Sequence, residues 1–422
     1  MNSVPDSRFR SRRSVPHALV SSFYFERGFS YIYAFTGKLL SKLREIVSRV
    51  LLALGGCVGA LLVLEVVVRL IEPREVMRYF FEHADPVLHH AFVPNATGHY
   101  KTAEFETHYA INSLGLRDRE IAGDKPPGVV RILMVGDSYT EGDGVEADET
   151  FSKCLERELR KQFGQDSVEV INAGVGSYSS LLEYLYLRTR GIRLKPDLVI
   201  LNFDLSDVYD DLKYTAQARF DSSGIPSGVS PDPEQADGSF LVTVKDFFKQ
   251  NTRLYNFVRL RIDRYLEAAR RGEVHYGDLR FDKYAMLRAS YHPFSGNDWK
   301  TTEGYLLLIR DLLRREQIGF WLTVYPYGNQ VSRTEWAQGR LFWGFRPDTV
   351  YSTWPQEHLV AFCQAESIRA INLCGAFVRA SGHLSPLYLP YNGHWTPLGH
   401  RVVADALEPD VAAYVTSLRR RQ

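Results

Sequence analysis

The stretch RILMVGDSYTEGDGV, residues 131–145, decides the fold that we expect for this chain. It begins as a run of β-branched and other apolar residues, passes through Gly136-Asp137-Ser138, and continues as a polar segment that reads as the start of a helix. A serine at such a corner lies at the carboxyl edge of a parallel sheet, where open α/β folds bind ligands. Gly-Asp-Ser alone recurs by chance, but the whole block predicts a nucleophile at Ser138.

A second block, NGHWTPLGH at residues 392–400, lies near the other end of the chain. A serine hydroxyl is a poor nucleophile until a base removes its proton, and histidine is the usual base. His394 precedes the last predicted helix, so we predict it as the base. His400 is the rival base, although its predicted place within that helix is also explained by capping or packing.

Together these blocks resemble those of the SGNH/GDSL hydrolase superfamily of serine esterases and O-acyltransferases, over roughly residues 90–415. The family nucleophile falls on Ser138, and its last Asp and His fall on Asn392 and His394. The segment GHWTPLGH also resembles the Asp-x-His-Trp signature of bacterial polysaccharide O-acetyltransferases, without the Asp. The resemblance implies an α/β fold, a flavodoxin-like three-layer sandwich around a parallel sheet.

The pattern of the chain supports such a sheet independently, because strand-like and helix-like segments alternate from residue 130 onward. The predicted strands are Val130–Val135, Val168–Asn172, Leu198–Phe203, Gly319–Tyr325 and Ile368–Leu373. The predicted helices between and after them include Glu149–Phe163, Leu181–Gly191 and Arg401–Ala413. Strands separated by helices of this length predict right-handed βαβ units.

The resemblance also implies an oxyanion hole made of three donors. The first is the backbone N–H of Ser138. The second, a glycine N–H in the family, falls on Ser177, with Gly176 one residue earlier. The third, an Asn side chain in the family, falls on Ser206, whose hydroxyl can also donate.

Two family side chains are therefore altered, at Ser206 and Asn392. An Asn at the third triad position accepts a hydrogen bond from the imidazole but carries no charge to stabilise imidazolium. We expect a variant branch that still works; the alternative is a lineage that kept the fold and lost rate. Asp204 and Asp207 are the predicted supporting carboxylates for His394, although capping and loop solvation explain them equally well.

An N-terminal transmembrane helix is predicted over residues 50–71. Residues 50–64 carry no charge, and the whole segment would span roughly 33 Å as a helix, about one hydrocarbon core. Residues 1–49 hold nine Arg and Lys against three acids, whereas residues 72–86 hold two against four. The positive-inside rule then places the N-terminus in the cytoplasm and the main domain outside the cell membrane. A lipoprotein cleavage box at Cys57 and a buried core helix are the alternatives.

The resulting domain plan has four parts, with an insertion in the last. They are a basic cytoplasmic segment (1–49), the membrane helix (50–71), strands and loops ahead of the main domain (84–127), and an SGNH hydrolase-like domain (128–418) with an insertion at about 213–317. Within the insertion, residues 221–239 are predicted to form a mobile loop and residues 240–271 a basic amphipathic helical region. That region either packs on the domain or binds an anionic surface.

Composition narrows the function classes. A net charge of +1 gives no whole-chain basic field, so no nucleic-acid partner is implied. The four cysteines and the histidines of residues 83–108 show no metal-ligand spacing, so we expect no metal and no cofactor. Aromatic side chains that could stack on a sugar are Tyr325, Tyr327, Trp336, Trp343 and Trp354, although aromatics more often fill a core.

These observations predict a serine esterase that acts on O-acyl, above all O-acetyl, esters of an extracytoplasmic glycan through an acyl-serine intermediate. The bilayer, through residues 50–71, and the acylated glycan or another small ester are its expected partners. The alternatives are an O-acyltransferase, which would need a membrane partner to donate the acyl group, and a non-catalytic glycan-binding or assembly protein on the same fold. The sequence does not separate hydrolysis from transfer, because both pass through acyl-Ser138.

Overall fold

The computed structural model describes residues 18–71, 81–102, 104–231, 296–342, 345–382 and 385–420, with a few single residues between 244 and 258. The chain divides into two compact units, residues 1–71 and 72–422. The predicted helix of residues 240–271 and Trp343 lie essentially outside the described residues.

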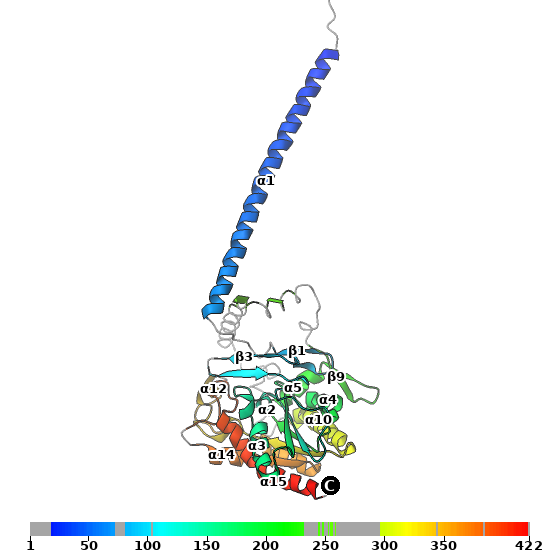
Figure 1. Cartoon of the computed structure of the whole chain (residues 1–422), viewed down its shortest axis with the longest axis vertical. Helices are drawn as coiled ribbons and strands as arrows, with labels where there is room; N and C mark the ends of the chain where they lie inside the picture. Colours follow the sequence, from blue (N-terminus) through cyan, green and yellow to red (C-terminus); the bar gives the residue numbers. More distant parts are fainter. Residues whose placement is uncertain are drawn as a thin grey trace, which may run out of the picture. The chain divides into compact units, whose positions relative to one another are not determined.

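The first unit contains one long helix, α1 (Ala18–Ile71), of 54 residues (Figure 1). Its segment Lys42–Leu70, 29 residues with a mean hydropathy of 2.5, is a candidate membrane span whose side chains are not buried within the protein. The candidate span therefore begins earlier than the predicted residue 50. An apolar helix of this length exceeds what one hydrocarbon core requires.

The second unit is built on a five-stranded sheet with the order β11-β10-β7-β5-β6. The strands are β5 (Val130–Gly136), β6 (Val168–Gly174), β7 (Leu198–Phe203), β10 (Gly319–Val324) and β11 (Arg369–Asn372). All neighbouring pairs are parallel. This is the flavodoxin-like strand order, with the order reversing at β5, so the predicted fold class is confirmed.

Helices cover both faces of the sheet. The chain steps from β5 to β6 in one direction and then back past β5 to β7, so right-handed crossovers put the intervening helices on opposite faces. Helix α3 (Phe151–Phe163) packs against α15 (Pro397–Arg419) in one layer. Helix α4 (Ser180–Thr189) packs against α5 (Asp207–Thr215) and α10 (Gly296–Arg315) in the other (Figure 1). Covering on both faces explains why β5, β6 and β7 read as nearly continuous apolar runs.

Shorter helices complete the unit. They are α2 (Ser138–Glu141), α11 (Gly328–Val331), α12 (Ala337–Phe342), α13 (Trp354–Ala365) and α14 (Cys374–Ala380), with 3₁₀ turns η2 (Ala147–Glu149) and η3 (Gly191–Leu194). Helix α15 is longer than the predicted Arg401–Ala413. It begins at Pro397, a favoured first position, and the side chain of Thr396 caps it by accepting the Gly399 N–H.

Two antiparallel hairpins precede the sheet. One pairs β1 (Glu82–Asp85) with β2 (His89–Phe92), and the other pairs β3 (Thr97–Lys101) with β4 (Glu106–Ala110). We call residues 81–121, which contain both hairpins and the chain that follows them, the N-terminal cap. Its aromatic residues Phe81, Phe92 and Tyr109 are buried in the core of the unit, so the cap is an integral part of that core.

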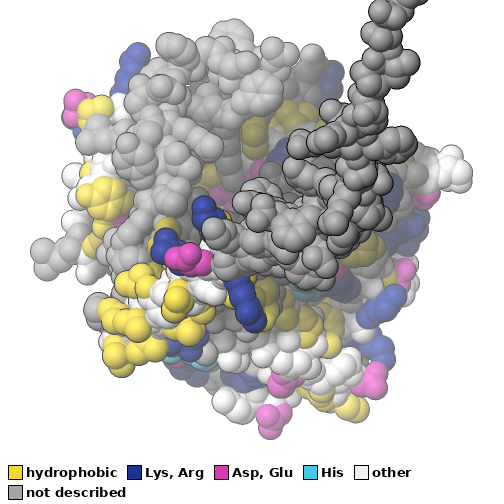
Figure 2. Space-filling view, turned by 90° about the horizontal axis from the view of Figure 1, so that it is seen from above, with side chains coloured by type: hydrophobic (Ala, Val, Ile, Leu, Met, Phe, Trp, Pro, Cys, Tyr) yellow, Lys and Arg dark blue, Asp and Glu magenta, His cyan; other side chains and the backbone are white. Residues whose placement is uncertain are grey.

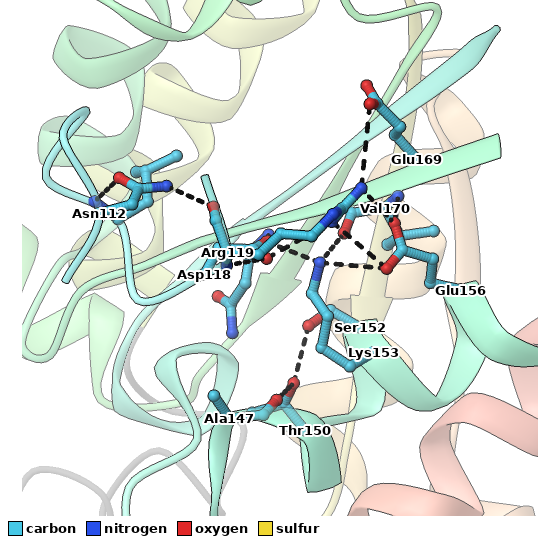
Figure 3. A network of polar contacts seen from close by, with 12 residues as sticks. Asn112, Asp118, Arg119, Ala147, Thr150, Ser152, Lys153, Glu156, Glu169 and Val170 are labelled. Atoms are coloured by element: carbon cyan, nitrogen blue, oxygen red, sulfur yellow. Dashed lines mark hydrogen bonds and ion pairs between the residues drawn. The ribbon is translucent and has the colours of Figure 1, made fainter. Parts of the chain in front are cut away.

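A charged network ties the end of the cap to the sheet layer (Figure 3). Asp118 pairs with Lys153 of α3 at 2.7 Å and accepts the backbone N–H of Asn172 in β6. Arg119 reaches Glu156 of α3 at 3.1 Å, and both acids of these pairs are largely buried. Because a buried charge is costly without its partner, this network fixes where the cap sits on the domain.

The prediction of a mobile loop over residues 221–239 was wrong for its first part. Residues Ala218–Phe220 (β8) and Pro226–Val229 (β9) pair as a short antiparallel hairpin. The side chain of Asp221 caps the turn by accepting the N–H groups of Ser223 and Ile225, which is the kind of local bond that Asp and Asn side chains form in turns. Residues 232–239 lie outside the described part of the chain.

The surface of the molecule mixes charge types. On the face shown in Figure 2, Lys and Arg side chains are interspersed with Asp and Glu, and a group of hydrophobic side chains gathers at one side. This mixture accords with the net charge of +1.

Candidate active site

Ser138 lies at the corner where β5 gives way to α2. Gly136 is required at the end of the strand, because a Cβ there would collide with the side chain of Thr140. Asp137 caps α2 by accepting the Tyr139 N–H at 2.9 Å. The local sequence thus turns the chain sharply and presents Ser138 as the first residue of α2, at the carboxyl edge of the sheet.

Ser138 and His394 meet although they are 256 residues apart in the sequence. The Ser138 hydroxyl is 2.7 Å from Nε2 of His394, within hydrogen-bond reach. On the other side of the ring, Nδ1 donates to Oδ1 of Asn392, and the same oxygen accepts the His394 backbone N–H at 3.1 Å. The three residues predicted as the catalytic group therefore form one hydrogen-bonded chain.

The loop that carries His394 is held from two directions. The Tyr139 hydroxyl donates to the carbonyl of Gly393 at 2.8 Å, and its ring lies 4.6 Å from the imidazole. From the cap, the carboxylate of Glu104 accepts the N–H groups of Tyr391 and Asn392 at 2.6 and 2.8 Å. These contacts fix the position of the imidazole ring. Glu104 was not predicted, because nothing in its local sequence marks it.

The carboxylate of another acid, Asp143, lies beside His394. Its Oδ2 is 3.8 Å from Nδ1 of His394, and its side chain is only 4% exposed. Asp143 was not among the predicted residues, although it lies five residues after the serine in the opening block. The local signal was the Gly-Asp-Gly turn at residues 142–144, which reads as an ordinary loop.

The serine and histidine open into a small cavity of about 80 Å³. It is lined by Asp137, Ser138, Tyr139, Asp204, Ser206, Tyr327, Trp336, Asn392, Gly393 and His394. Of the predicted aromatic residues, Tyr327 and Trp336 thus reach the cavity. Tyr325 is buried and donates to Asp204 at 2.6 Å, while Trp354 packs on His358 and Trp299.

The predicted backbone donor at Gly176 is wrong. The Gly176 N–H donates at 2.7 Å to Oε2 of Glu141, a fully buried acid at the end of α2. The Gly176 carbonyl is bonded to Nε2 of His90 in the cap. Ser177 adopts the left-handed conformation that the family glycine would permit, with φ +61°, but it is exposed and is not among the residues that line the cavity. A donor already used by a buried carboxylate is not available to an oxyanion.

Ser206, by contrast, lines the cavity as predicted. Its backbone N–H donates to Oδ1 of Asp204 at 2.7 Å, which leaves the hydroxyl as the group that can act toward a ligand. The Ser138 N–H, predicted as the first donor, lies in the first turn of α2, where N–H groups have no acceptor within the helix.

Neither predicted supporting carboxylate is the one next to His394. Asp204 accepts hydrogen bonds from the hydroxyls of Tyr325 and Tyr327, both at 2.6 Å. Asp207 is fully buried, and burial together with the nearby acid Glu183 raises its pKa well above the usual range. Asp143 instead lies 3.8 Å from Nδ1 of His394. The turn after α2 that brings it there depends on tertiary contacts.

The rival base, His400, does not fit that role. It is fully buried within α15, and its Nδ1 accepts the Phe151 N–H at 3.2 Å. Burial, with the nearby charges of Arg117 and His394, lowers its pKa to about 3. His400 therefore stays neutral and serves packing, which agrees with the structural alternative considered for it.

A group of buried acids lies between α4 and α5, close behind the site. Burial raises the pKa of Asp211 to about 7. Asp211 accepts hydrogen bonds from the Leu181 N–H and the Thr302 hydroxyl, at 2.9 and 2.7 Å. Within the described residues, no group of three or more His, Cys, Asp or Glu is arranged to hold a metal ion.

No protein-family model matches this sequence, and no curated protein matches it. Similar solved structures include a two-domain esterase active on acetylated mannans, at 13% identity and a TM-score of 0.34, covering 70% of this chain and 50% of that one. The chain thus spans about half the length of that esterase.

Two other similar structures are covered almost completely. A variant of an acetyl-xylooligosaccharide esterase from Geobacillus Stearmophilus is 12% identical, with a TM-score of 0.37 and coverage of 67% and 95%. A protein of the G-D-S-L family from Desulfitobacterium hafniense is 11% identical, with a TM-score of 0.34 and coverage of 66% and 98%. Likeness at this level carries no argument about activity, so the function has to be argued from the site.

Proposed function

We propose that this chain is an SGNH-type serine esterase that removes small O-acyl groups, above all acetyl, from an extracytoplasmic glycan. The observation that carries the proposal is the 2.7 Å contact between the Ser138 hydroxyl and Nε2 of His394 at the mouth of a cavity. A nucleophile within hydrogen-bond reach of a base, with the base oriented by a further group, is the arrangement that activates a serine.

The reaction runs in two steps. Ser138 Oγ attacks the ester carbonyl while Nε2 of His394 takes its proton; the tetrahedral intermediate then collapses, and the imidazolium returns the proton to the departing sugar hydroxyl. Water then attacks acyl-Ser138 while the same nitrogen takes its proton, and the imidazolium returns this proton to Ser138 Oγ as the acid is released. The Asn392 side chain accepts the Nδ1 proton, which keeps Nε2 unprotonated and facing the serine.

The negative oxygen of the intermediate would be stabilised by the Ser138 N–H and the Ser206 hydroxyl. Both belong to residues that line the cavity. Each donor of this kind contributes because it is already aimed at the place where charge develops.

The size of the cavity favours a short acyl group. The space beside Ser138, about 80 Å³, is bounded by the buried rings of Tyr327 and Trp336, so a small acyl group such as acetyl fits against the serine.

The glycan part of the proposal rests on the resemblance of the Asn-Gly-His-Trp block and on the expected location outside the membrane. Tyr391, next to Asn392 in the sequence, is 53% exposed, so an aromatic side chain near this block is open to stack on a sugar. Residues Lys42–Leu70 would anchor the protein in the cell membrane, with the N-terminus in the cytoplasm.

The test is hydrolysis of p-nitrophenyl esters by the full chain in detergent. We expect turnover of the acetate, a rate that falls steeply from acetate to octanoate, and loss of turnover in Ser138→Ala. Ser223→Ala, which changes an exposed serine in the turn between β8 and β9, is the matched control and should leave the rate unchanged. Turnover that survives in Ser138→Ala would overturn the proposal.

A further inference from the structure

Asp143 is held in a fixed position beside the imidazole of His394. It lies in a turn between Gly142 and Gly144, whose φ values of +88° and +92° are favourable only for glycine. A Cβ at Gly144 would come within 2.5 Å of the Leu389 side chain, so this turn packs directly on the chain that leads to His394. The close packing places Oδ2 of Asp143 3.8 Å from Nδ1.

The N-terminal cap holds this turn in place. The buried guanidinium of Arg117 donates to the carbonyls of Gly142 and Val145, both at 2.6 Å, and stacks over the Tyr109 ring at 3.9 Å. The Asp143 backbone N–H donates to the Ser138 carbonyl at 3.0 Å. Asp143 is therefore fixed to both the serine helix and the cap, as expected of a side chain with a defined task rather than a solvated loop acid.

The hydrogen bond from Nδ1, however, goes to Asn392, the closer of the two partners. An amide oxygen orients the ring and fixes its tautomer, but it does not offset the positive charge that His394 gains when it takes the serine proton. A carboxylate at 3.8 Å does so without a hydrogen bond, because the interaction of two charges falls off only slowly with distance and is weakly screened in a buried site.

We propose that Asn392 and Asp143 divide the third role of the triad: Asn392 orients the His394 ring, and Asp143 supplies the negative charge. This inference rests on the proposed function. Asp143 is a positioning residue: its charge acts on His394, and it does not touch the substrate. It explains how the site works without the Asp that the SGNH resemblance places at residue 392.

Two other acids face the same cavity and have to be distinguished from Asp143. Asp137 caps α2, and Asp204 receives two tyrosine hydroxyls; both line the cavity. Both contribute a background field at His394. The proposal requires the Asp143 effect to exceed theirs, because Oδ2 of Asp143 lies 3.8 Å from Nδ1 and would pair with the ring once it is protonated.

The first test follows the NMR titration of the His394 imidazole in the full chain in detergent. Asp143→Asn keeps the shape of the side chain and removes its charge, so the titration midpoint should move to lower pH by about one unit. Asp148→Asn changes an exposed acid of the same segment and should leave the midpoint unchanged. An unchanged midpoint in Asp143→Asn would overturn the proposal.

The second test is kinetic. Asp143→Asn should lower kcat by roughly ten- to a hundred-fold with little change in KM, since the lost interaction forms with the imidazolium of the transition state. Adding Asn392→Asp to Asp143→Asn moves the charge to the neighbouring position and should recover most of the loss. No recovery, with the fold intact by circular dichroism, would contradict the division of roles.

The two tests separate this inference from the proposed function. If the wild type hydrolyses no ester but Asp143→Asn still shifts the His394 titration, the esterase proposal fails and the charge assignment stands. If the wild type is active and the titration does not shift, the reverse holds.

Discussion

The two halves of the candidate site differ in how completely they are assembled. On the proton-transfer side, Ser138, His394 and Asn392 form a continuous hydrogen-bonded chain, with Asp143 beside it. On the oxyanion side, the turn after β6 is tied to Glu141 and His90, while Ser138 and Ser206 line the cavity. The comparison teaches that hydrogen bonds join the described residues of the proton-transfer side throughout, whereas the Gly176 N–H of the oxyanion side is taken by a buried carboxylate.

The largest effect should come from the proton-transfer half. His394→Ala removes the imidazole that lies 2.7 Å from the Ser138 hydroxyl, so kcat/KM should fall by about 10³- to 10⁴-fold. The esterase assay on purified full chain measures this loss. His400→Ala is a poor control because it opens a buried cavity, so His358→Ala, a half-buried histidine of α13, serves instead. A loss of less than tenfold would place the base elsewhere.

A rise in pH should destabilise the fold through Asp211, a buried acid behind the oxyanion side. Asp211 accepts the N–H of Leu181 at the start of α4, the helix that follows the β6 turn. Its pKa rises from 3.8 to about 7 on folding, so the unfolded chain ionises first. The stabilisation is present below pH 4 and is lost as the pH rises to 7, by up to about 4 kcal/mol.

Urea unfolding between pH 4 and pH 8 measures this dependence. Asp211→Asn removes the titrating group, so the difference in unfolding free energy between wild type and variant should change over that window and stay constant above it. A difference that is independent of pH would show that Asp211 is ionised in the folded protein.

The smallest effect should come from the two serines that the family resemblance placed in the oxyanion hole. Ser206→Ala removes a hydroxyl at the cavity and should lower kcat by roughly tenfold. This is less than the usual cost of losing a well-aimed oxyanion-hole donor. Ser177→Ala, outside the cavity, should have no effect on kcat. Kinetics of the two variants side by side check the role of the Ser206 hydroxyl, because Ser177→Ala keeps its backbone N–H and serves as the control; an unchanged kcat in Ser206→Ala would contradict that role.

Much of the fold could be predicted from the sequence. The strands β5, β6 and β7 are apolar runs buried on both faces, and such runs are visible without tertiary information. The positions of Ser138 and His394 could also be predicted, because each lies in a block whose local sequence determines a strand-to-helix corner or the approach to a helix.

The remaining features depend on contacts that no local pattern encodes. Gly176 was predicted as an oxyanion donor, but the carboxylate of Glu141 takes its N–H, and this pairing follows from how α2 packs on β6. Asp143 was missed because its role arises only when the turn after α2 meets the loop of His394. The cap residues Glu104 and Arg117 were missed for the same reason, since each acts on backbone far away in the sequence.

The most direct test of the central claim is covalent labelling of the full chain with a fluorophosphonate, read by mass spectrometry. The account predicts a single adduct on the peptide that contains Ser138, its absence in Ser138→Ala, and much slower labelling in His394→Ala. An adduct on any other residue, or a wild-type chain that takes no label, would contradict the assignment of Ser138 as an activated nucleophile.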